Sequence, residues 1–223
     1  LRMATAEFRG IEENINALLA RLDESFRQLR EFSAQVAHEL RTPLTLLRLQ
    51  VEESAGRIEP VLAESLQDEL RRLSNYVDQC LLLATAEQGR LILQLEPVSL
   101  RATVLGMMEI YELLAREGER RLTVAAAEDA TVTVDPRYLR QMLHNLLTNA
   151  LRHGKGAILV TVGRDGTDLV CRVSNRVSDQ TPSSARGTGL GLRIVRALAA
   201  LHPQLAFKSD EVAGRFTAEF RWS

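Results

Sequence analysis

The 223-residue chain has only two cysteines and almost no net charge. Cys80 and Cys171 stand far apart in apolar surroundings, which excludes a disulfide framework and a cysteine-spaced metal site. We therefore expect both thiols to be buried in a reducing compartment. A formal net charge of −1 gives no electrostatic basis for binding a nucleic acid or an anionic membrane.

Long hydrophobic runs are also missing. No apolar run approaches the roughly 18–20 residues of a membrane-spanning helix, and no signal peptide is visible. The composition, 45% hydrophobic and 26% charged residues, is typical of a soluble globular protein with one large or two modest domains. The chain begins at Leu1 close to a helical pattern, so we expect it to be a fragment of a longer protein.

The first part of the chain predicts two long helices. From Ile11 onward, apolar residues recur at spacings of three and four, which favours a helix that pairs with a copy of itself. Pro43 removes a backbone donor and predicts a kink, whereas Pro60 suits the first turn of a second helix. Ala55-Gly56 separates the two helices, and Gly89 closes the hairpin. Two antiparallel helices cannot bury both apolar faces alone, so we predict a dimeric four-helix bundle.

The second part of the chain predicts mixed helices and strands after a linker at Glu96-Pro97. Asp135 is a good N-cap before Pro136, and Asp165-Gly166 indicates a hairpin turn. This order predicts an α+β sandwich, one sheet with helices on one face. We expect helices at 100–117, 136–152 and 190–201, and strands at 122–127, 131–134, 157–164, 169–175, 205–208 and 215–222.

A candidate nucleophile lies in the segment Phe32–Leu44, FSAQVAHELRTPL, which places His38 directly before Glu39. Imidazole has a reference pKa of about 6.5, and a neighbouring carboxylate can hold one ring nitrogen protonated and leave the other free to attack. Thr42 follows one helical turn later on the same face. An isolated His-Glu pair would be better explained as part of a solvated helix, but thirteen residues in this order are far more specific.

Two further segments suit a phosphate ligand. In HNLLTNALRHG, Asn145 and Asn149 are four residues apart and share a helix face. In the segment 187–192, three alternate glycines precede an apolar helix, so the backbone can approach phosphates and present its N–H groups at a helix N-terminus. Either feature alone has a plain structural explanation, a satisfied buried amide or a flexible turn. We assign no role to His144 or His202.

Together the three segments resemble the H, N and G2 boxes of sensor histidine kinases from two-component systems. The resemblance implies a dimerisation and histidine phosphotransfer domain at 27–94 and, at 97–223, an ATP-binding domain of the histidine-kinase/Hsp90/gyrase superfamily. It implies that His38 is the phosphoacceptor and Glu39 the general base. Thr42 would orient the water that dephosphorylates a response regulator.

The stretch before the kinase helix resembles the last helix of a HAMP signal-relay module, which would cover residues 1–26. This resemblance implies an upstream membrane-spanning sensor that is absent from the chain. The fragment itself would be cytoplasmic, and the full-length protein would lie in the bacterial inner membrane.

The same family resemblance implies a site for ATP and Mg²⁺. Asn149 would offer its carbonyl oxygen to Mg²⁺, Asn145 would support the phosphates or the metal shell, and Arg152 would face the phosphates. His153 stands where a tyrosine is common in the family. The implied nucleotide-binding residues are Asn145, Asn149, Arg152, His153, Asn175, Gly187, Thr188, Gly189, Leu190, Gly191 and Leu192.

The G1 box departs from the family pattern. Asn175 stands where the family has an aspartate that accepts from the adenine amino group, and both glycines of the box are missing from 175–179. The lid before Gly187 is short and has no phenylalanine. A neutral hydrogen bond is worth about 0.5–1.5 kcal/mol against about 1.5–3 for a charged one, so we expect a loss of around tenfold in affinity.

These observations leave three hypotheses. The first is a homodimeric autokinase that passes phosphate to a response-regulator aspartate and also has phosphatase activity. The alternative is a nucleotide-weak, phosphatase-biased regulatory module. The third, a superfamily ATPase without a phosphoacceptor, is disfavoured by the segment around His38. The sequence leaves open whether His38 receives phosphate from its own subunit or from its mate.

Overall fold

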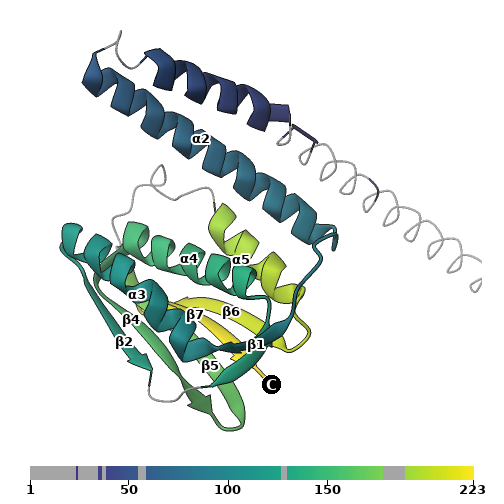
Figure 1. Ribbon diagram of the computed structural model, residues 1–223. Coiled ribbons are helices and arrows are strands. Elements are labelled where there is room, and N and C mark those ends of the chain that lie inside the picture. Colours follow the sequence, from purple (N-terminus) through teal and green to yellow (C-terminus); the bar gives the residue numbers. More distant parts are fainter. Residues whose placement is uncertain (1–23, 25–34, 37–38, 55–58, 127–129, 178–188) are drawn as a thin grey trace, which may run out of the picture. The chain divides into compact units, whose positions relative to one another are not determined.

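The computed structural model describes residues 24, 35–36, 39–54, 59–126, 130–177 and 189–223 (Figure 1). The chain divides into two compact units, Leu1–Gln88 and Gly89–Ser223. The predicted HAMP-like segment, His38 and the predicted helix end at Ala55-Gly56 fall outside the described residues, apart from residue 24.

The first unit is a helical hairpin. Residues 39–54 are helical, and α2 (Pro60–Glu87) returns beside them (Figure 1). Pro60 occupies the first turn of α2, as predicted, and Gly89 follows the helix with a φ of 63°. The guanidinium of Arg41 ties the two helices together, because its Nε donates to Asp78 Oδ1 at 3.0 Å. Pro43 lies within helical residues, and the kink there stays a prediction.

Much of the apolar surface of this unit is exposed. On α2, Leu66 (40% exposed) and Leu73 (43%) lie on the same side as the buried Leu70. Cys80 lies on this apolar side and is exposed, so the prediction that both thiols are buried is wrong for Cys80. The physical reason is that the described part of the chain covers Leu70 on this side of α2 but leaves Cys80 uncovered. The exposed large apolar residues of the unit are Leu40, Leu46, Leu47, Leu49, Val61, Leu62, Leu66, Leu73 and Tyr76.

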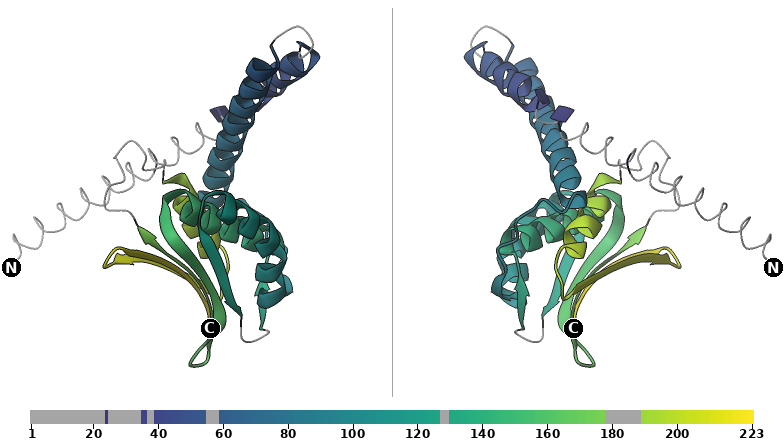
Figure 2. Two further views of the ribbon diagram at one scale, coloured as in Figure 1. Left: turned by 90° about the vertical axis from the view of Figure 1, so that its left-hand side faces the viewer. Right: turned by 90° about the vertical axis from the view of Figure 1, so that its right-hand side faces the viewer.

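The second unit is an α+β sandwich, as predicted. Its five-stranded sheet has the order β2-β4-β5-β7-β6, in which β2 pairs with β4 in parallel and all other neighbours are antiparallel. Its helices lie on one face of this sheet (Figure 2). The elements are β1 (Glu96–Ser99), α3 (Leu100–Glu117), β2 (Arg121–Ala126), β3 (Thr131–Val134), α4 (Pro136–His153), β4 (Gly154–Asp165), β5 (Asp168–Val177), α5 (Leu190–Ala200), β6 (Leu205–Val212) and β7 (Arg215–Trp222).

The core lies between the sheet and its helices. Alternate strand residues such as Ile158, Val160 and Phe220 are at most 1% exposed, and they face apolar side chains of α4 and α5 such as Leu146 and Ile194. Cys171 is also fully buried, as predicted, and its burial raises the thiol pKa to about 12. Among the described residues, no helix is long and apolar enough to cross a membrane.

The region 96–97 differs from the prediction. Glu96 and Pro97 begin strand β1, which pairs antiparallel with β3, so they are not a linker. A proline is tolerated there because β1 belongs to a two-stranded sheet in which each strand has a free edge. The connector just before β1 is also anchored, since the N–H of Gln94 donates to Asp135 Oδ2 at 2.8 Å.

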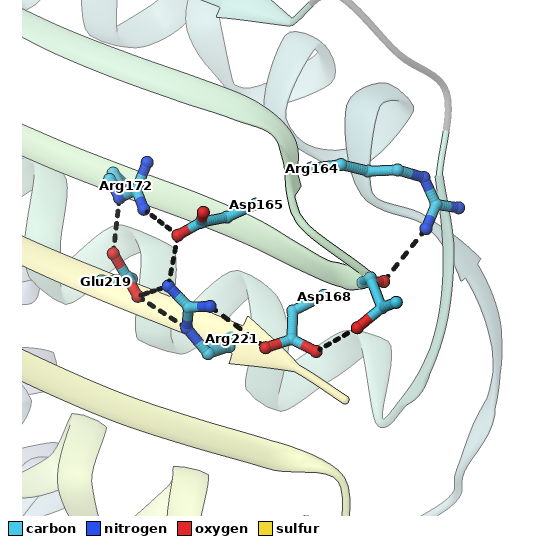
Figure 3. A network of polar contacts seen from close by, with 7 residues as sticks. Arg164, Asp165, Asp168, Arg172, Glu219 and Arg221 are labelled. Carbon is cyan, nitrogen blue, oxygen red and sulfur yellow. Dashed lines mark hydrogen bonds and ion pairs between the residues drawn. The ribbon is translucent and has the colours of Figure 1, made fainter.

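A polar network covers part of the sheet face opposite the helices (Figure 3). Arg221 of β7 contacts Asp165 at 2.7 Å and Asp168 at 3.1 Å, across the start of β5. Arg172 joins the network through Asp165 and Glu219. Hydrogen bonds from Arg221 are the largest cause that lowers the pKa of Asp165. Two arginines pair here with three carboxylates from β7 and from the β4–β5 hairpin, which indicates a role in fastening the last strand to the hairpin.

Candidate functional site

The helix of residues 39–54 exposes two of the predicted site residues. Glu39 and Thr42 are both exposed on helical residues. The side-chain amide of Gln35 donates to Glu39 Oε1 at 3.1 Å, one helical turn away. The carboxylate that follows His38 in the sequence is therefore accessible and held by a neighbour.

Helix α4 carries the two predicted asparagines. Asp135 caps this helix, because its side chain accepts from the N–H of Arg137, and Pro136 occupies the first turn. Asn145 is 4% exposed, and Asn149 is half-buried one turn later. Oδ1 of Asn145 accepts from Gln141 at 3.4 Å, whereas its Nδ2 is buried without a partner among the described residues.

The end of α4 carries two of the predicted nucleotide-binding residues, Arg152 and His153. Arg152 is exposed and His153 is half-buried. Burial is the larger cause that lowers the pKa of His153, and the neighbouring charge of Arg152 adds to it. At neutral pH the positive charge here therefore belongs to Arg152.

The glycine segment meets α4 at Asn145. Gly187 and Thr188 fall outside the described residues, but Gly189 is the N-cap of α5 with a φ of 67°, a conformation that favours glycine. Leu190, Gly191 and Leu192 form the first turn of α5. A Cβ on Gly191 would lie 3.9 Å from Cβ of Asn145, so the start of α5 lies directly against the middle of α4.

Asn175 of β5 lies beside the end of α4. It is 3% exposed, and its Nδ2 donates to the carbonyl of Arg176 at 3.1 Å. Its Oδ1 is buried and, in the described part of the chain, accepts no hydrogen bond. Gly154 allows this approach, because a Cβ there would lie 2.9 Å from Nδ2 of Asn175 and 2.3 Å from the carbonyl of Ala150.

These features fit a nucleotide. Buried polar groups are almost always paired. Among the described residues, the donor of Asn145 and the acceptor of Asn175 lack a partner, as do Gln88 Nε2 and Trp222 Nε1, and the two asparagine atoms are free to pair with a ligand. The N-terminus of α5, next to Asn145, favours an anion. The described residues contain no group of three or more His, Cys, Asp or Glu side chains that could hold a metal ion.

Sequence reasoning missed two histidine contacts. His202 is 3% exposed and hydrogen-bonded through both ring nitrogens, to the backbone of Asp135 and of Leu198. His144 Nδ1 shares a hydrogen bond with the hydroxyl of Tyr111 on α3. The available signal for His202 was its place between Leu201 and Pro203, directly after the apolar stripe of a helix.

Two family models match the chain. Residues 28–89 match the His Kinase A (phospho-acceptor) domain, and residues 134–222 match the Histidine kinase-, DNA gyrase B-, and HSP90-like ATPase. The chain belongs to the sensor histidine kinases. Among curated relatives, the sensor protein CzcS of Cupriavidus metallidurans is 31% identical over 242 aligned residues, which cover 96% of this chain and 50% of CzcS. The sensor histidine kinase CusS of Escherichia coli K12 is also 31% identical, over 94% of this chain and 49% of CusS.

Solved histidine kinases share the fold. The Acinetobacter baumannii histidine kinase AdeS gives a TM-score of 0.65 at 23% identity and covers 83% of this chain and 97% of its own. Full-length ShkA, solved in complex with AMPPNP, gives a TM-score of 0.71 at 24% identity over 86% of this chain and 46% of its own. This histidine kinase chain spans about half the length of the curated relatives it matches.

Proposed function

We propose that this chain is the catalytic core of a protein-histidine autokinase that uses ATP. The observation that carries the proposal is the contact between Gly191 and Asn145, which joins two of the predicted nucleotide segments in a chain that also has the phosphoacceptor segment. An imidazole nitrogen of His38 would attack the γ-phosphorus of ATP and form an N–P bond. The bond to the β,γ-bridging oxygen would break and release ADP, while Glu39 would take the imidazole proton.

The geometry of the second unit supports the nucleotide-binding roles proposed for its residues. Asn149 would face Mg²⁺ through its amide oxygen, and Asn145 would use its unpaired Nδ2 toward the phosphates. The exposed Arg152 would offset phosphate charge. The metal would supply charge neutralisation on the phosphates. The N–H groups of 187–191 would cradle them, and the unpaired Oδ1 of Asn175 would accept from the adenine amino group. His153, Thr188, Leu190 and Leu192 would complete the lining.

We propose that the first unit works as a homodimer. Its exposed apolar side, which includes Leu66 and Cys80, is what a second hairpin would cover in a four-helix bundle. Dimerisation and phosphotransfer would occupy 27–94, ATP binding 97–223, and a HAMP-like helix 1–26. Because relatives about twice as long are named sensor proteins, an upstream sensing region in the bacterial inner membrane completes the proposal.

The phosphoryl group would then pass from His38 to an aspartate of a response-regulator receiver domain. The exposed Thr42, one turn beyond His38, would orient a water that dephosphorylates the regulator. Substitution of Thr42 by Ala should then reduce regulator dephosphorylation more than autophosphorylation. Equal losses of both activities would count against this role.

A second function, a nucleotide-weak and phosphatase-biased module, is favoured by one observation. The acceptor of Asn175 is neutral, and a neutral acceptor binds an amino group more weakly than a carboxylate does. This module would bind the nucleotide but carry little kinase flux.

Labelling separates the two functions. The chain is incubated with γ-labelled ATP and Mg²⁺, and an autokinase takes up acid-labile, base-stable label that is lost in His38→Gln. His144→Gln is the matched control, because His144 lies on α4 outside the proposed machinery, and this variant should still be labelled. Label that persists in His38→Gln would exclude the proposed phosphoacceptor. Nucleotide binding without any label would favour the phosphatase-biased module.

A further inference from the structure

Three segments of the nucleotide-binding unit meet at Asp135. The residue is 0% exposed, and its carboxylate accepts from the N–H of Gln94 at 2.8 Å and from the N–H of Arg137 at 3.0 Å. Its own N–H donates to Nε2 of His202 at 3.2 Å. The connector before β1, the first turn of α4 and the turn after α5 are therefore held by one buried residue.

His202 can accept this bond in only one form. Its Nδ1 lies 2.8 Å from the carbonyl of Leu198, which has no hydrogen to donate, so Nδ1 carries the proton. Nε2 is then the free acceptor for the N–H of Asp135. The neutral ring thus ties the last turn of α5 to the residue that caps α4.

This tie lies at the opposite end of α5 from the nucleotide segment. Helix α5 has 11 residues and so spans about 16 Å. Its first turn places Gly191 against Asn145, while Leu198 and His202 hold its other end at Asp135. If α5 moves as a rigid rod, a shift at the His202 end would change how its first turn meets Asn145.

We propose that His202 is a positioning residue for the ATP site. By joining the end of α5 to the cap of α4, it sets the spacing between the two helices that carry the asparagines and the glycine segment. His202 lies outside every motif that the sequence assigns to nucleotide binding, and it needs no contact with the nucleotide. The inference rests on the proposed ATP site.

The test measures binding of AMP-PNP with Mg²⁺ to the full chain by titration calorimetry, well below the melting temperature. His202→Phe keeps a ring of similar size but removes the acceptor, and it should weaken binding by about tenfold. His202→Gln can place an amide oxygen near the position of Nε2, and it should recover much of the lost affinity. Rescue by Gln distinguishes positioning from a loss of packing.

A matched control accounts for general destabilisation. Phe207 of β6 packs on Phe220 of β7 with ring centroids 5.2 Å apart, within the sheet rather than at the ends of α4 and α5. Phe207→Leu should lower the melting temperature and leave the dissociation constant for AMP-PNP unchanged. Unchanged binding in His202→Phe, or equal weakening in Phe207→Leu, would overturn the inference. A wild-type chain that binds no AMP-PNP would contradict the proposed function itself, and the inference would fall with it.

Discussion

The two units of this histidine kinase chain differ in how many of their large apolar side chains are fully buried. In the nucleotide-binding unit, large residues such as Phe220, Ile194 and Leu198 are 0% exposed. In the helical unit, Leu62 and Leu66 of α2 are 49% and 40% exposed. One chain therefore completes the core of the nucleotide-binding unit, whereas the helical unit has an apolar side that a second copy would cover.

The two units also differ in where their polar side chains lie: at the surface in the helical unit and partly in the interior in the nucleotide-binding unit. The Arg41–Asp78 pair of the helical unit is exposed, and such pairs contribute about 0–1 kcal/mol. The nucleotide-binding unit buries polar groups. Asp135 and His202 are paired, whereas one side-chain atom each of Asn145, Asn175 and Trp222 has no partner among the described residues. Unpaired buried atoms cost stability, and those of Asn145 and Asn175 lie on or beside α4, where the proposed nucleotide would pair with them.

The largest predicted effect is a loss of dimerisation through the helical unit. Leu66→Glu places a charge on the exposed apolar side of α2, and burial of one leucine is worth about 1.5–3 kcal/mol. With two copies in a dimer, we expect the dimer to weaken by roughly 10²–10⁴-fold in sedimentation experiments. Asn75→Glu is the matched control, because Asn75 is exposed and nine residues away, on the opposite side of the helix. If Leu66→Glu dimerises like wild type, this side of α2 is not the interface.

The second prediction concerns the stability of the nucleotide-binding unit. Phe220→Ala empties a site that is 0% exposed, and such changes cost about 3–5 kcal/mol. Calorimetry should show a melting temperature for this unit that is lower by roughly 10–20 °C. Val212→Ala is the control, since Val212 of β6 is 67% exposed and should leave the transition almost unchanged. Similar shifts for both variants would contradict the assignment of this core.

The third prediction concerns acid stability at Asp135. Burial would raise the pKa of this carboxyl, but hydrogen bonds from the Arg137 side chain and from the N–H groups of Gln94 and Arg137 outweigh burial and lower the pKa from 3.8 to about 2. A lowered pKa stabilises the folded state above pH 3.8, and this stability is lost as the pH falls through about 2.

Urea unfolding at pH 5 and at pH 2.5 tests the contribution of Asp135. We expect wild type to lose more stability than Asp135→Asn between the two values, by about 2 kcal/mol, because Asn still caps α4 but does not titrate. Equal losses in the two proteins would show that Asp135 titrates normally. Glu219 and Asp165 also have lowered pKa values, but they are common to both proteins and cancel.

The sequence predicted most of the helices and strands, but not the long-range contacts made at their ends. Hydrophobic periodicity, the Asp135 cap and the Asp165-Gly166 turn suffice for the sandwich because each acts within a few residues. The bond between Asp135 and His202 joins residues 67 positions apart, and no local pattern indicates such a pairing. The interpretation of Glu96-Pro97 as a linker was wrong for the same reason, since β1 depends on its distant partner β3. Exposure of Cys80 was missed because apolar periodicity shows which side of a helix is apolar, not what covers it.

The smallest predicted effect concerns the unpaired acceptor of Asn175 in the nucleotide-binding unit. Asn175→Asp replaces a neutral acceptor by a charged one at the unpaired Oδ1, and the difference of about 1–1.5 kcal/mol corresponds to about tenfold tighter binding of AMP-PNP. The same change removes the Nδ2 donor to the Arg176 carbonyl, so the melting temperature should fall while affinity rises. Ser174→Asp, which adds the same charge one residue earlier on the other face of β5, should not tighten binding. Affinity that stays equal or weakens in Asn175→Asp would show that Asn175 does not meet adenine. For an asparagine with only a structural role, the change would lower the melting temperature without tightening the binding of AMP-PNP.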